Sequence, residues 1–398
     1  MAREMKRVAF ITSYYVNNYG TFLQTYATQE ILEKIGYKPE LISVKKLWKE
    51  IKIKRRKYFL KQALTSSMGI HKCGIFFSRM IKKIGVGGYA INAKKREKVF
   101  GVCREEKLHF SPQYNTISEL HVGINERYNS VIVGSDQLWL PGNIVGDYYT
   151  LSFVPDNVNK VSYSTSFGQS YVPHELIEKT SIFLDRINYL SVRETSGQRI
   201  IKEISGRDAK IVLDPVLLFD KEYWEGCIGD KPIIEGNYIF CYILGKRKSG
   251  RKFAKALKAK CNYKIVNMPN LDEYILGDDK YTDIKLYEVS PFDFLNLIYY
   301  AKYVITDSFH CTAFSILFHK AFFIFHRHKD KSVYSTNSRI DDLLERADLK
   351  NRLMFDDQGL DDALLEATSS FEAADHYIEN ARRESIIFLE NALSHGEG

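Results

Sequence analysis

One short stretch of this sequence joins a strand-like segment directly to a helix-like one, and this pairing constrains the fold more than any other feature. The apolar run from Tyr303 to Thr306 ends in Asp307 and Ser308, and a helical pattern begins at once. The start of a helix carries unpaired N–H groups and a partial positive charge, so such a turn suits an anion. His310, at this turn, could also exchange a proton near neutral pH. Alternatively, Ser308 only caps the helix and His310 is a surface residue.

The same strand–turn–helix arrangement recurs along the chain. Helical patterns, such as those of residues 21–35 and 249–261, separate successive strand-like runs. Alternation of this kind predicts an α/β protein with parallel sheets covered by helices. The strand-like runs lie at residues 7–13, 39–44, 128–134, 160–166, 190–193, 210–214, 238–244, 263–268 and 321–325.

The length of the chain predicts two domains. A single core stops growing at roughly 250–300 residues, and this chain has 398. We predict Rossmann-like domains over residues 1–220 and 221–398, with the irregular segment 219–236 as the link between them. Polar turns at the strand ends of both domains imply that the domains face a cleft. A helix at about 370–394 is expected to pack back across both domains.

Residues 45–107 form a basic insertion in the first predicted domain. Lysines and arginines crowd residues 45–57 and recur at 82–83 and 94–98. A basic helical face beside aromatic residues could rest on an anionic lipid surface, as a peripheral membrane contact through residues 45–98. The alternative is a solvated helical insertion that covers the first domain, and we favour it because charge runs are more commonly solvated.

Composition narrows the class of protein. The net charge of +8 suits acidic small molecules or a membrane surface as readily as nucleic acid. The many Tyr and Phe residues are not interleaved with arginines, which argues against a nucleic-acid platform. The six cysteines include no C-x-x-C pair, the N-terminus resembles a first strand more than a signal peptide, and no apolar run approaches about 20 residues. We therefore expect a cytoplasmic protein, placed at the inner face of the membrane if the basic region binds lipid.

Polar side chains at the predicted strand ends form the candidate site. Arg193 could hold a carboxylate or phosphate, or form an ion pair with Glu194 or a neighbouring acid. Asp136 could act as a base or accept from a sugar hydroxyl, or it could be a turn or cap residue. Cys311 could be a nucleophile, although a cysteine entering an apolar helix is more often a packing residue. The candidates are Asn18, Gly20, Ser135, Asp136, Gln137, Ser166, Arg193, Ser308, His310 and Arg327.

The sequence lacks motifs that are typical of dinucleotide-binding, serine-nucleophile and metal sites. The loop after the first strand lacks G-x-G-x-x-G, no G-x-S-x-G occurs, and no metal-ligand spacing stands out. We therefore expect neither a metal nor a dinucleotide cofactor.

Six segments occur in the same order as in a known family: NYGTFLQTYATQEILEKIGY, VIVGSDQLW, YSTSFG, SVRE-x-SG, VLDP and VITDSFHCTAFSILF. Together, over residues 7–326, they resemble the polysaccharide pyruvyl transferase family. The resemblance implies a fold similar to the GT-B glycosyltransferases. It also implies transfer of a pyruvyl group from phosphoenolpyruvate to a sugar, commonly as a cyclic ketal that bridges two hydroxyls, with no cofactor besides this donor substrate.

The resemblance implies roles for three residues. Arg193 matches the family arginine that holds the donor. His310 matches the histidine of the S-x-H-G motif and would act as general acid, protonating the methylene carbon of the donor or relaying a proton. Asp136, in the GSDQ-W motif, is a candidate base or a group that orients the acceptor.

The chain departs from the family pattern at three positions. Cys311 replaces the usual glycine after the histidine, and Leu140 replaces the usual asparagine after the tryptophan. Ser308 stands where some relatives carry a basic residue, so phosphate contacts could come from Arg327 or Lys329. The expected role is to modify a sugar, or a lipid-linked oligosaccharide, during surface or capsular polysaccharide synthesis.

Two alternatives remain at this point. A GT-B glycosyltransferase would use a nucleotide sugar, but no acidic or glycine-rich nucleotide motif is evident in the second domain. A non-catalytic anion- or glycan-binding protein would keep Arg193 and tolerate the loss of His310.

Overall fold

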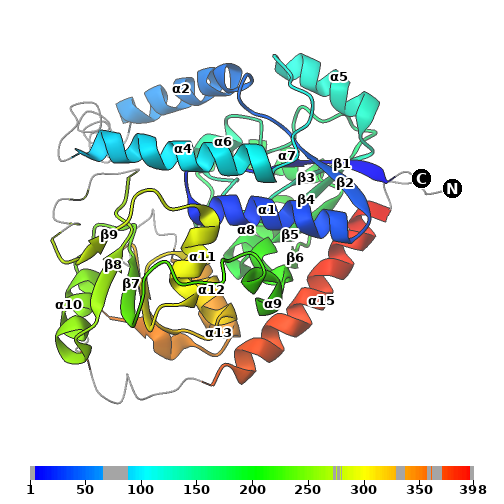
Figure 1. Ribbon diagram of the computed structural model, residues 1–398. Helices are drawn as coiled ribbons and strands as arrows, with labels where there is room; N and C mark the ends of the chain where they lie inside the picture. Colours follow the sequence, from blue (N-terminus) through cyan, green and yellow to red (C-terminus); the bar gives the residue numbers. More distant parts are fainter. Residues whose placement is uncertain are drawn as a thin grey trace. The chain divides into compact units, whose positions relative to one another are not determined.

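The computed structural model describes residues 5–65, 88–271, 275, 278, 280–328, 337–355, 360 and 370–394. These residues group into two compact units, and Figure 1 labels most of their helices and strands. The first unit holds the described chain up to Thr65, Lys107–Leu218 and the residues from Glu379 onward. The second unit holds most of α4 (Tyr89–Lys107) and Phe219–Ile378. Within the described ranges, none of the helices combines the length and apolar character that a membrane span needs.

Six parallel strands form the sheet of the first unit, in the order β2-β1-β3-β4-β5-β6. Runs such as Val8–Ile11 are fully buried, as expected for a parallel sheet covered on both faces. The strand order changes direction between β1 and β3, which makes their carboxyl ends a switch point of the kind where such sheets bind ligands. The strands are β1 (Lys6–Ile11), β2 (Tyr37–Leu41), β3 (Ser130–Val133), β4 (Asn159–Thr165), β5 (Tyr189–Val192) and β6 (Lys210–Ile211).

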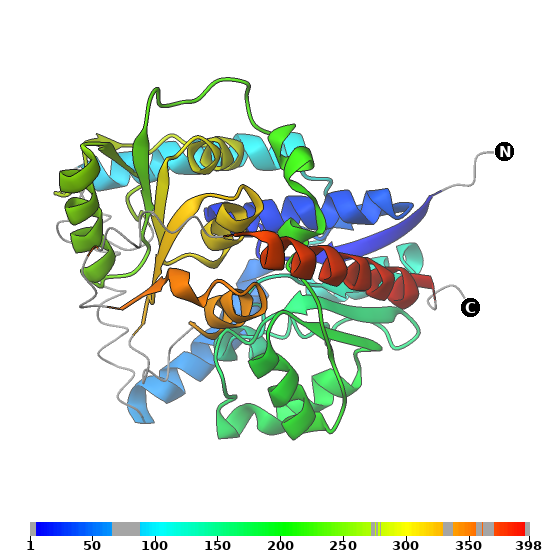
Figure 2. The ribbon, with the colours of Figure 1, turned by 90° about the horizontal axis from the view of Figure 1, so that it is seen from below.

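Helices cover both faces of this sheet (Figure 2). The hydroxyl of Thr12, just after β1, bonds that of Thr25 on α1, and Tyr163 of β4 packs on Phe388 of α15, so α1 and α15 share one face. Gly197 of α8 contacts the opposite face at β5. The helices are α1 (Tyr19–Lys34), α2 (Trp48–Thr65), α5 (Ile117–Arg127), α6 (Pro141–Ile144), α7 (Ile177–Asp185), α8 (Thr195–Ser205), α15 (Glu372–Ser394) and the 3-10 turns η2 (His174–Leu176) and η3 (Pro215–Leu218).

The second unit contains another sheet of six parallel strands, in the order β12-β11-β10-β7-β8-β9. Here the switch point lies between β7 and β10, which are adjacent in the sheet but far apart in sequence. The strands are β7 (Tyr238–Tyr242), β8 (Lys264–Asn267), β9 (Ile284–Lys285), β10 (Tyr303–Thr306), β11 (Ala321–Phe325) and β12 (Leu353–Met354).

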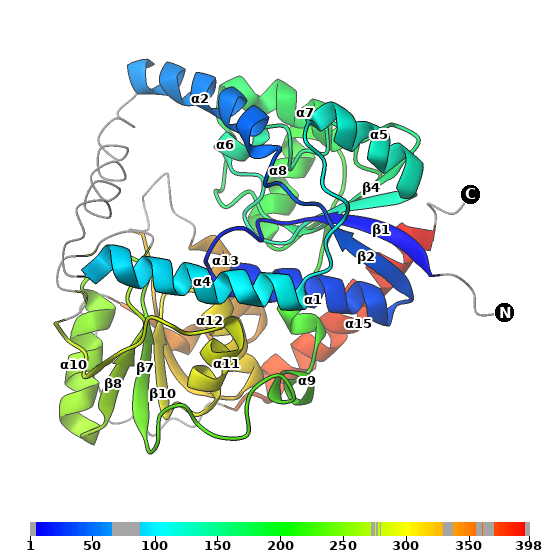
Figure 3. The ribbon, with the colours of Figure 1, turned by 45° about the horizontal axis from the view of Figure 1, so that its top comes forward.

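Alternate residues of these strands pack on different helices. Ile239 and Cys241 of β7 share a core cluster with Phe253 of α10, whereas Phe240 and Tyr242 point to the other face, where their rings meet Phe294 of α11. Figure 3 shows α10 and α11 on opposite sides of the strands. The helices are α9 (Lys221–Glu225), α10 (Ser249–Cys261), α11 (Pro291–Tyr299), α12 (Phe309–Leu317), α13 (Ser338–Arg346) and the 3-10 turn η4 (Lys350–Arg352).

The contact-based units group two segments differently from the predicted ranges 1–220 and 221–398. Most of α4 belongs to the second unit, and the chain from Glu379 onward belongs to the first. There α15 is held by hydrogen bonds such as that from the backbone N–H of Leu213 to the hydroxyl of Ser385, at 3.0 Å. As boundaries of independently folding domains, the two ranges remain a prediction.

Part of the predicted basic insertion, residues 66–87, lies outside the described residues. The helix α13 begins after Asn337, whose side chain makes no capping hydrogen bond.

Candidate active site

At the carboxyl edge of the first sheet, the turn directly after β3 requires glycine. Gly134, directly after β3, has φ of 142°, and a Cβ atom there would lie 1.8 Å from the carbonyl oxygen of Tyr163. This close approach carries Ser135 into the interior, where its backbone N–H donates to the side-chain oxygen of Gln24 at 3.1 Å. The turn thus places the GSDQ segment against α1 and β4.

Arg193 lies in this edge, directly after β5, and is buried. Its Nη2 atom is 2.6 Å from Oδ2 of Asp214, which follows β6, and it also donates to the hydroxyl of Ser135. The Ser135 hydroxyl bonds the same Asp214 oxygen at 3.0 Å. The predicted alternative of an ion pair is therefore realised, with Asp214 as a partner.

The backbone of Asp136 is left-handed, with φ of 83°. Both oxygens of its side chain accept hydrogen bonds. Oδ1 accepts from the backbone N–H of Gln137 and Oδ2 from the hydroxyl of Thr21, both at 2.8 Å. The first contact is the turn role expected as the alternative. The second joins Asp136 to the first turn of α1, at the switch point of the sheet.

The remaining candidates of the first unit have local structural contacts. Asn18 is the N-cap of α1 and its side chain accepts from the backbone N–H of Thr21 at 3.1 Å, while Gly20 is buried in the same first turn. The hydroxyl of Ser166 donates to Glu194 at 2.8 Å. The structure brings Ser135 and Arg193 into direct contact, and holds Asn18 and Ser166 in hydrogen bonds to other residues.

In the second unit, Asp307 connects the two loops of the switch point. Its carboxylate accepts from the backbone N–H groups of Leu244, at 2.8 Å, and Gly245, at 2.6 Å, both just after β7. Arg327, after β11, donates to the backbone oxygen of Asp307 at 3.1 Å and lies 3.5 Å from its carboxylate. The carboxyl ends of β7, β10 and β11 are thereby tied together.

His310 lies in the first turn of α12, two residues beyond its N-cap Ser308. Both residues are buried, and the His310 ring meets that of Phe309 edge to face, at 5.2 Å between centroids. Ser308 occupies the N-cap position, as the alternative expected, but its side chain makes no capping bond, and its backbone N–H donates to Thr306. His310 is not a surface residue, and the amino end of α12 holds an imidazole in a partially positive field.

Cys311 is fully buried, and burial raises the pKa of its thiol to about 12. A thiol that stays protonated at neutral pH is a poor nucleophile. The packing alternative is therefore the better one for this residue.

Three residues that sequence reasoning missed help build these edges: Thr21, Asp214 and Asp307. Each follows or faces a strand end: Asp214 is the last residue of the predicted strand-like run 210–214, and Asp307 directly follows the run from Tyr303 to Thr306. Position alone did not reveal their partners, which come from other strands. Among the residues that the structure describes, no group of three His, Cys, Asp or Glu side chains could hold a metal ion.

The family model for polysaccharide pyruvyl transferase matches residues 18–328. No curated protein matches the chain. Among solved structures, the UDP-N-acetylglucosamine 2-epimerase of Rickettsia bellii is similar with a TM-score of 0.50 at 8% identity, over 99% of this chain and 98% of that chain. Another UDP-N-acetylglucosamine 2-epimerase is similar with a TM-score of 0.53 at 8% identity, over 96% and 95% of the two chains.

At such low identity this likeness concerns the fold alone, and it confirms the predicted GT-B-like fold class with two Rossmann-like sheets. The family match supports a conclusion beyond the fold, because it covers most of the chain and includes the turns that hold Ser135, Arg193 and His310. The chain belongs to the polysaccharide pyruvyl transferase family.

Proposed function

We propose that this protein transfers a pyruvyl group from phosphoenolpyruvate to hydroxyls of a sugar, and so forms a pyruvate ketal during surface or capsular polysaccharide synthesis. The observation that carries the proposal is the place of His310, buried in the first turn of α12 at a switch point, within the region matched by the family. An imidazole there can donate a proton beside bound phosphate.

His310, in its protonated form, gives a proton to the methylene carbon of the donor. A sugar hydroxyl forms a bond to C2 as the double bond is lost, and its proton passes to a base, for which Asp136 is the candidate. A second hydroxyl then forms the other C–O bond at C2, the C–O bond to phosphate breaks, and the second proton leaves with the phosphate. The products are one cyclic ketal and one inorganic phosphate.

Arg193 is assigned to the carboxylate or phosphate of the donor. Its Nη2 atom is engaged by Asp214 and Ser135, which fixes the plane of the guanidinium before any substrate binds. A fixed fork of donors suits a planar carboxylate. Phosphate contacts from Arg327 are proposed in place of the basic residue that Ser308 replaces. Ser135, Gln137, Ser166, Asn18 and Gly20 are kept in the proposal as lining residues.

The test is an incubation with phosphoenolpyruvate and a panel of galactosides and N-acetylhexosaminides, followed by phosphate release and by the mass gain of a pyruvyl ketal. His310→Gln should lower kcat by about 10²–10⁴-fold, the usual contribution of a positioned general acid. His319→Gln is the matched control, since His319 lies just beyond the other end of α12 and bonds Asp375 at 2.8 Å. Turnover with a nucleotide sugar but not with phosphoenolpyruvate would reject the reaction. Full activity of His310→Gln would reject only the assigned role.

The acceptor is proposed to be a sugar or lipid-linked oligosaccharide met in the cytoplasm, with peripheral contact at the inner membrane face. The outer side of α2 supports this, since Lys52, Ile53, Arg56, Lys57 and Leu60 are exposed there. Such a mixture of cations and apolar side chains is typical of helices that lie on anionic lipid. Vesicle binding that is unchanged when Lys52, Arg56 and Lys57 are replaced by Gln would contradict the contact.

A further inference from the structure

A cluster of aromatic and basic side chains in the first unit has no part in the proposed chemistry. Its members are Tyr15, Lys52, Trp48, Arg55 and Tyr149, and we call it the Trp48 platform. The Tyr15 and Trp48 rings lie 5.0 Å apart between centroids, and the hydroxyl of Tyr149 donates to that of Tyr15 at 3.2 Å. Tyr15, Trp48 and Arg55 are only half-buried, so the platform is open on one side.

Two cations meet on the indole of this platform. The Arg55 guanidinium is 5.4 Å and the Lys52 ammonium 5.6 Å from the centroid of the Trp48 ring. Burial raises the pKa of the Tyr15 phenol, while its hydrogen bond with Tyr149 and the charge of Arg55 oppose that shift, which places Arg55 beside the phenol as well. Within the described part of the chain, no carboxylate forms an ion pair with Lys52 or Arg55, so two positive charges face the solvent without a neutralising acid.

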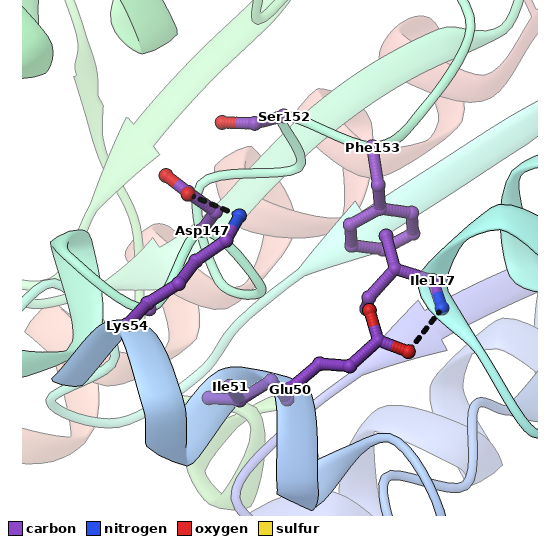
Figure 4. A pocket seen from close by; sticks show the side chains of 8 residues that line it. Glu50, Ile51, Lys54, Ile117, Asp147, Ser152 and Phe153 are labelled. Carbon is purple, nitrogen blue, oxygen red and sulfur yellow. Dashed lines mark hydrogen bonds and ion pairs between the residues drawn. The ribbon is translucent and has the colours of Figure 1, made fainter. Parts of the chain in front are cut away.

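The helix that carries these cations is fixed to the first unit. Lys54 is 2.6 Å from Asp147, and the backbone N–H of Ile117 donates to Glu50 at 3.3 Å, on either side of a small cavity (Figure 4). Gly146 lets the helix approach closely, since a Cβ there would lie only 3.1 Å from Cγ2 of Ile51 on the same helix. The platform is therefore held in one geometry before a ligand arrives, which lowers the entropic cost of binding.

The platform lies at the same sheet edge as Arg193, but at a distance from it. Tyr15, Trp48 and Tyr149 come from the segments after β1, β2 and β3, which are neighbours in the sheet, whereas Arg193 follows β5. With about 4.8 Å between strands, the step from β1 to β5 is about 14 Å. That separation is longer than a single sugar ring, so a group bound at the platform belongs to a part of the acceptor remote from the reacting hydroxyls.

We propose that the Trp48 platform is a binding site for a glycosyl phosphate, the part of the acceptor in which a sugar ring carries a phosphate or diphosphate. This rests on the proposed function. The apolar C–H face of the sugar packs on the rings of Trp48 and Tyr15. The phosphate pairs with Arg55 and Lys52, whose two charges match a dianion better than a single carboxylate. The acceptor is thereby recognised by its phosphate end. The length of the acceptor between this phosphate and the reacting hydroxyls then selects which sugar reaches the donor.

Tryptophan fluorescence can test this without any turnover. The chain has three tryptophans, and Trp139 and Trp224 are fully buried, so Trp48 is the one that a ligand can reach. N-acetylglucosamine 1-phosphate, added to the full chain without phosphoenolpyruvate, should shift the emission and protect it from acrylamide quenching. Trp48→Phe should abolish both changes. Arg55→Met should raise the Kd for the sugar phosphate by at least about tenfold, the effect of a lost charged hydrogen bond.

Matched controls separate the outcomes. Lys38→Met removes a charge at an exposed residue of the same unit, at the amino end of β2, and should leave the Kd unchanged. N-acetylglucosamine without phosphate should bind more weakly, and Arg55→Met should not weaken it further. If the soluble sugar phosphate gives no change, the same titration with a polyprenyl diphosphate-linked sugar in neutral vesicles identifies a lipid-borne source.

The proposal is rejected if neither the soluble nor the lipid-borne ligand changes the Trp48 emission. It is also rejected if the Arg55→Met variant binds the ligand as tightly as the natural protein does. The transferase proposal is judged separately by phosphate release from phosphoenolpyruvate. Turnover without a change in Trp48 fluorescence would support the reaction and reject the binding site at the platform. A change in Trp48 fluorescence without turnover would support the binding site and reject the reaction.

Discussion

Arg193 and Asp214 form a buried ion pair across the ends of two adjacent strands, with Nη2 2.6 Å from Oδ2 and side chains only 3% and 0% exposed. Both charges have left water, so each depends on the other and on the Ser135 hydroxyl, which contacts both. Removing one partner from such a pair leaves a buried charge without compensation. The pair therefore links the stability of the first unit to the geometry assigned to donor binding.

We predict that Arg193→Met lowers the free energy of unfolding of the first unit by about 3–5 kcal/mol, because the buried Asp214 carboxylate then lacks the compensating charge of Arg193. The double variant Arg193→Met with Asp214→Leu should recover most of that loss, since apolar residues of similar volume can replace a buried pair. Neither protein should transfer pyruvate. Urea unfolding followed by circular dichroism measures the first effect and phosphate release the second. A double variant as unstable as the single one would show that the pair is not the cause.

Gly134→Ala should be among the most damaging single changes in the chain. The added Cβ would lie 1.8 Å from the backbone oxygen of Tyr163, and neither backbone can move without disturbing β3 or β4. We expect a loss of about 4 kcal/mol or more, seen as poor yield of folded protein or a much lower Tm.

Gly36→Ala is the control that separates steric overlap from backbone strain. Gly36 also has a positive φ, of 93°, but nothing lies within 4 Å of a Cβ at this position. Its cost should stay near the 1–2 kcal/mol of a left-handed residue with a side chain. Equal costs for the two variants would mean that the contact with Tyr163 is not what makes Gly134 necessary.

The sequence predicted elements better than it predicted partners. Ser249–Cys261 and Ala321–Phe325 form a helix and a strand at the predicted bounds, because apolar spacing and β-branched or aromatic content are local properties. Asp307 bonds Leu244 and Gly245, which lie 63 and 62 residues away, and only the pairing of β10 with β7 brings them together. The same holds for Arg193, because the sequence pattern did not single out its partner Asp214, which follows the adjacent strand β6. A one-dimensional pattern predicts which residues reach a sheet edge, not which of them meet there.

Cys311→Ala should retain most of the transferase activity. The thiol is fully buried and its pKa is raised to about 12 by burial, so almost none of it is thiolate at neutral pH. The variant should lose about 1 kcal/mol of stability from the small cavity that it leaves. Native protein should also resist iodoacetamide at this residue, as peptide mass spectrometry can show. Inactive Cys311→Ala protein that is still folded would restore the nucleophile hypothesis.

Lys320, just before β11, has a lowered pKa of about 8, because of burial and of the nearby charges of Lys221 and Lys302. Its ammonium donates to the backbone oxygen of Tyr299 at 2.6 Å. The neutral amine is the reactive form, so trace acetylation of Lys320 should rise through pH 8, well below the usual lysine pKa of 10.5. Mass spectrometry of the labelled peptide measures this, with the exposed Lys255 as reference.

The same shift predicts how stability depends on pH. Between the folded pKa of about 8 and the unfolded value of 10.5, the unfolded chain binds more protons at this site than the folded chain does. Stability therefore rises with pH across that window, and below it the folded protein bears the cost of a charged, partly buried amine. Lys320→Met removes this group, so its Tm should exceed that of the natural protein at neutral pH and the difference should shrink as the pH approaches 10.5. A Tm difference that does not change with pH, or parallel labelling of Lys320 and Lys255, would show that the environment of Lys320 does not favour the neutral amine.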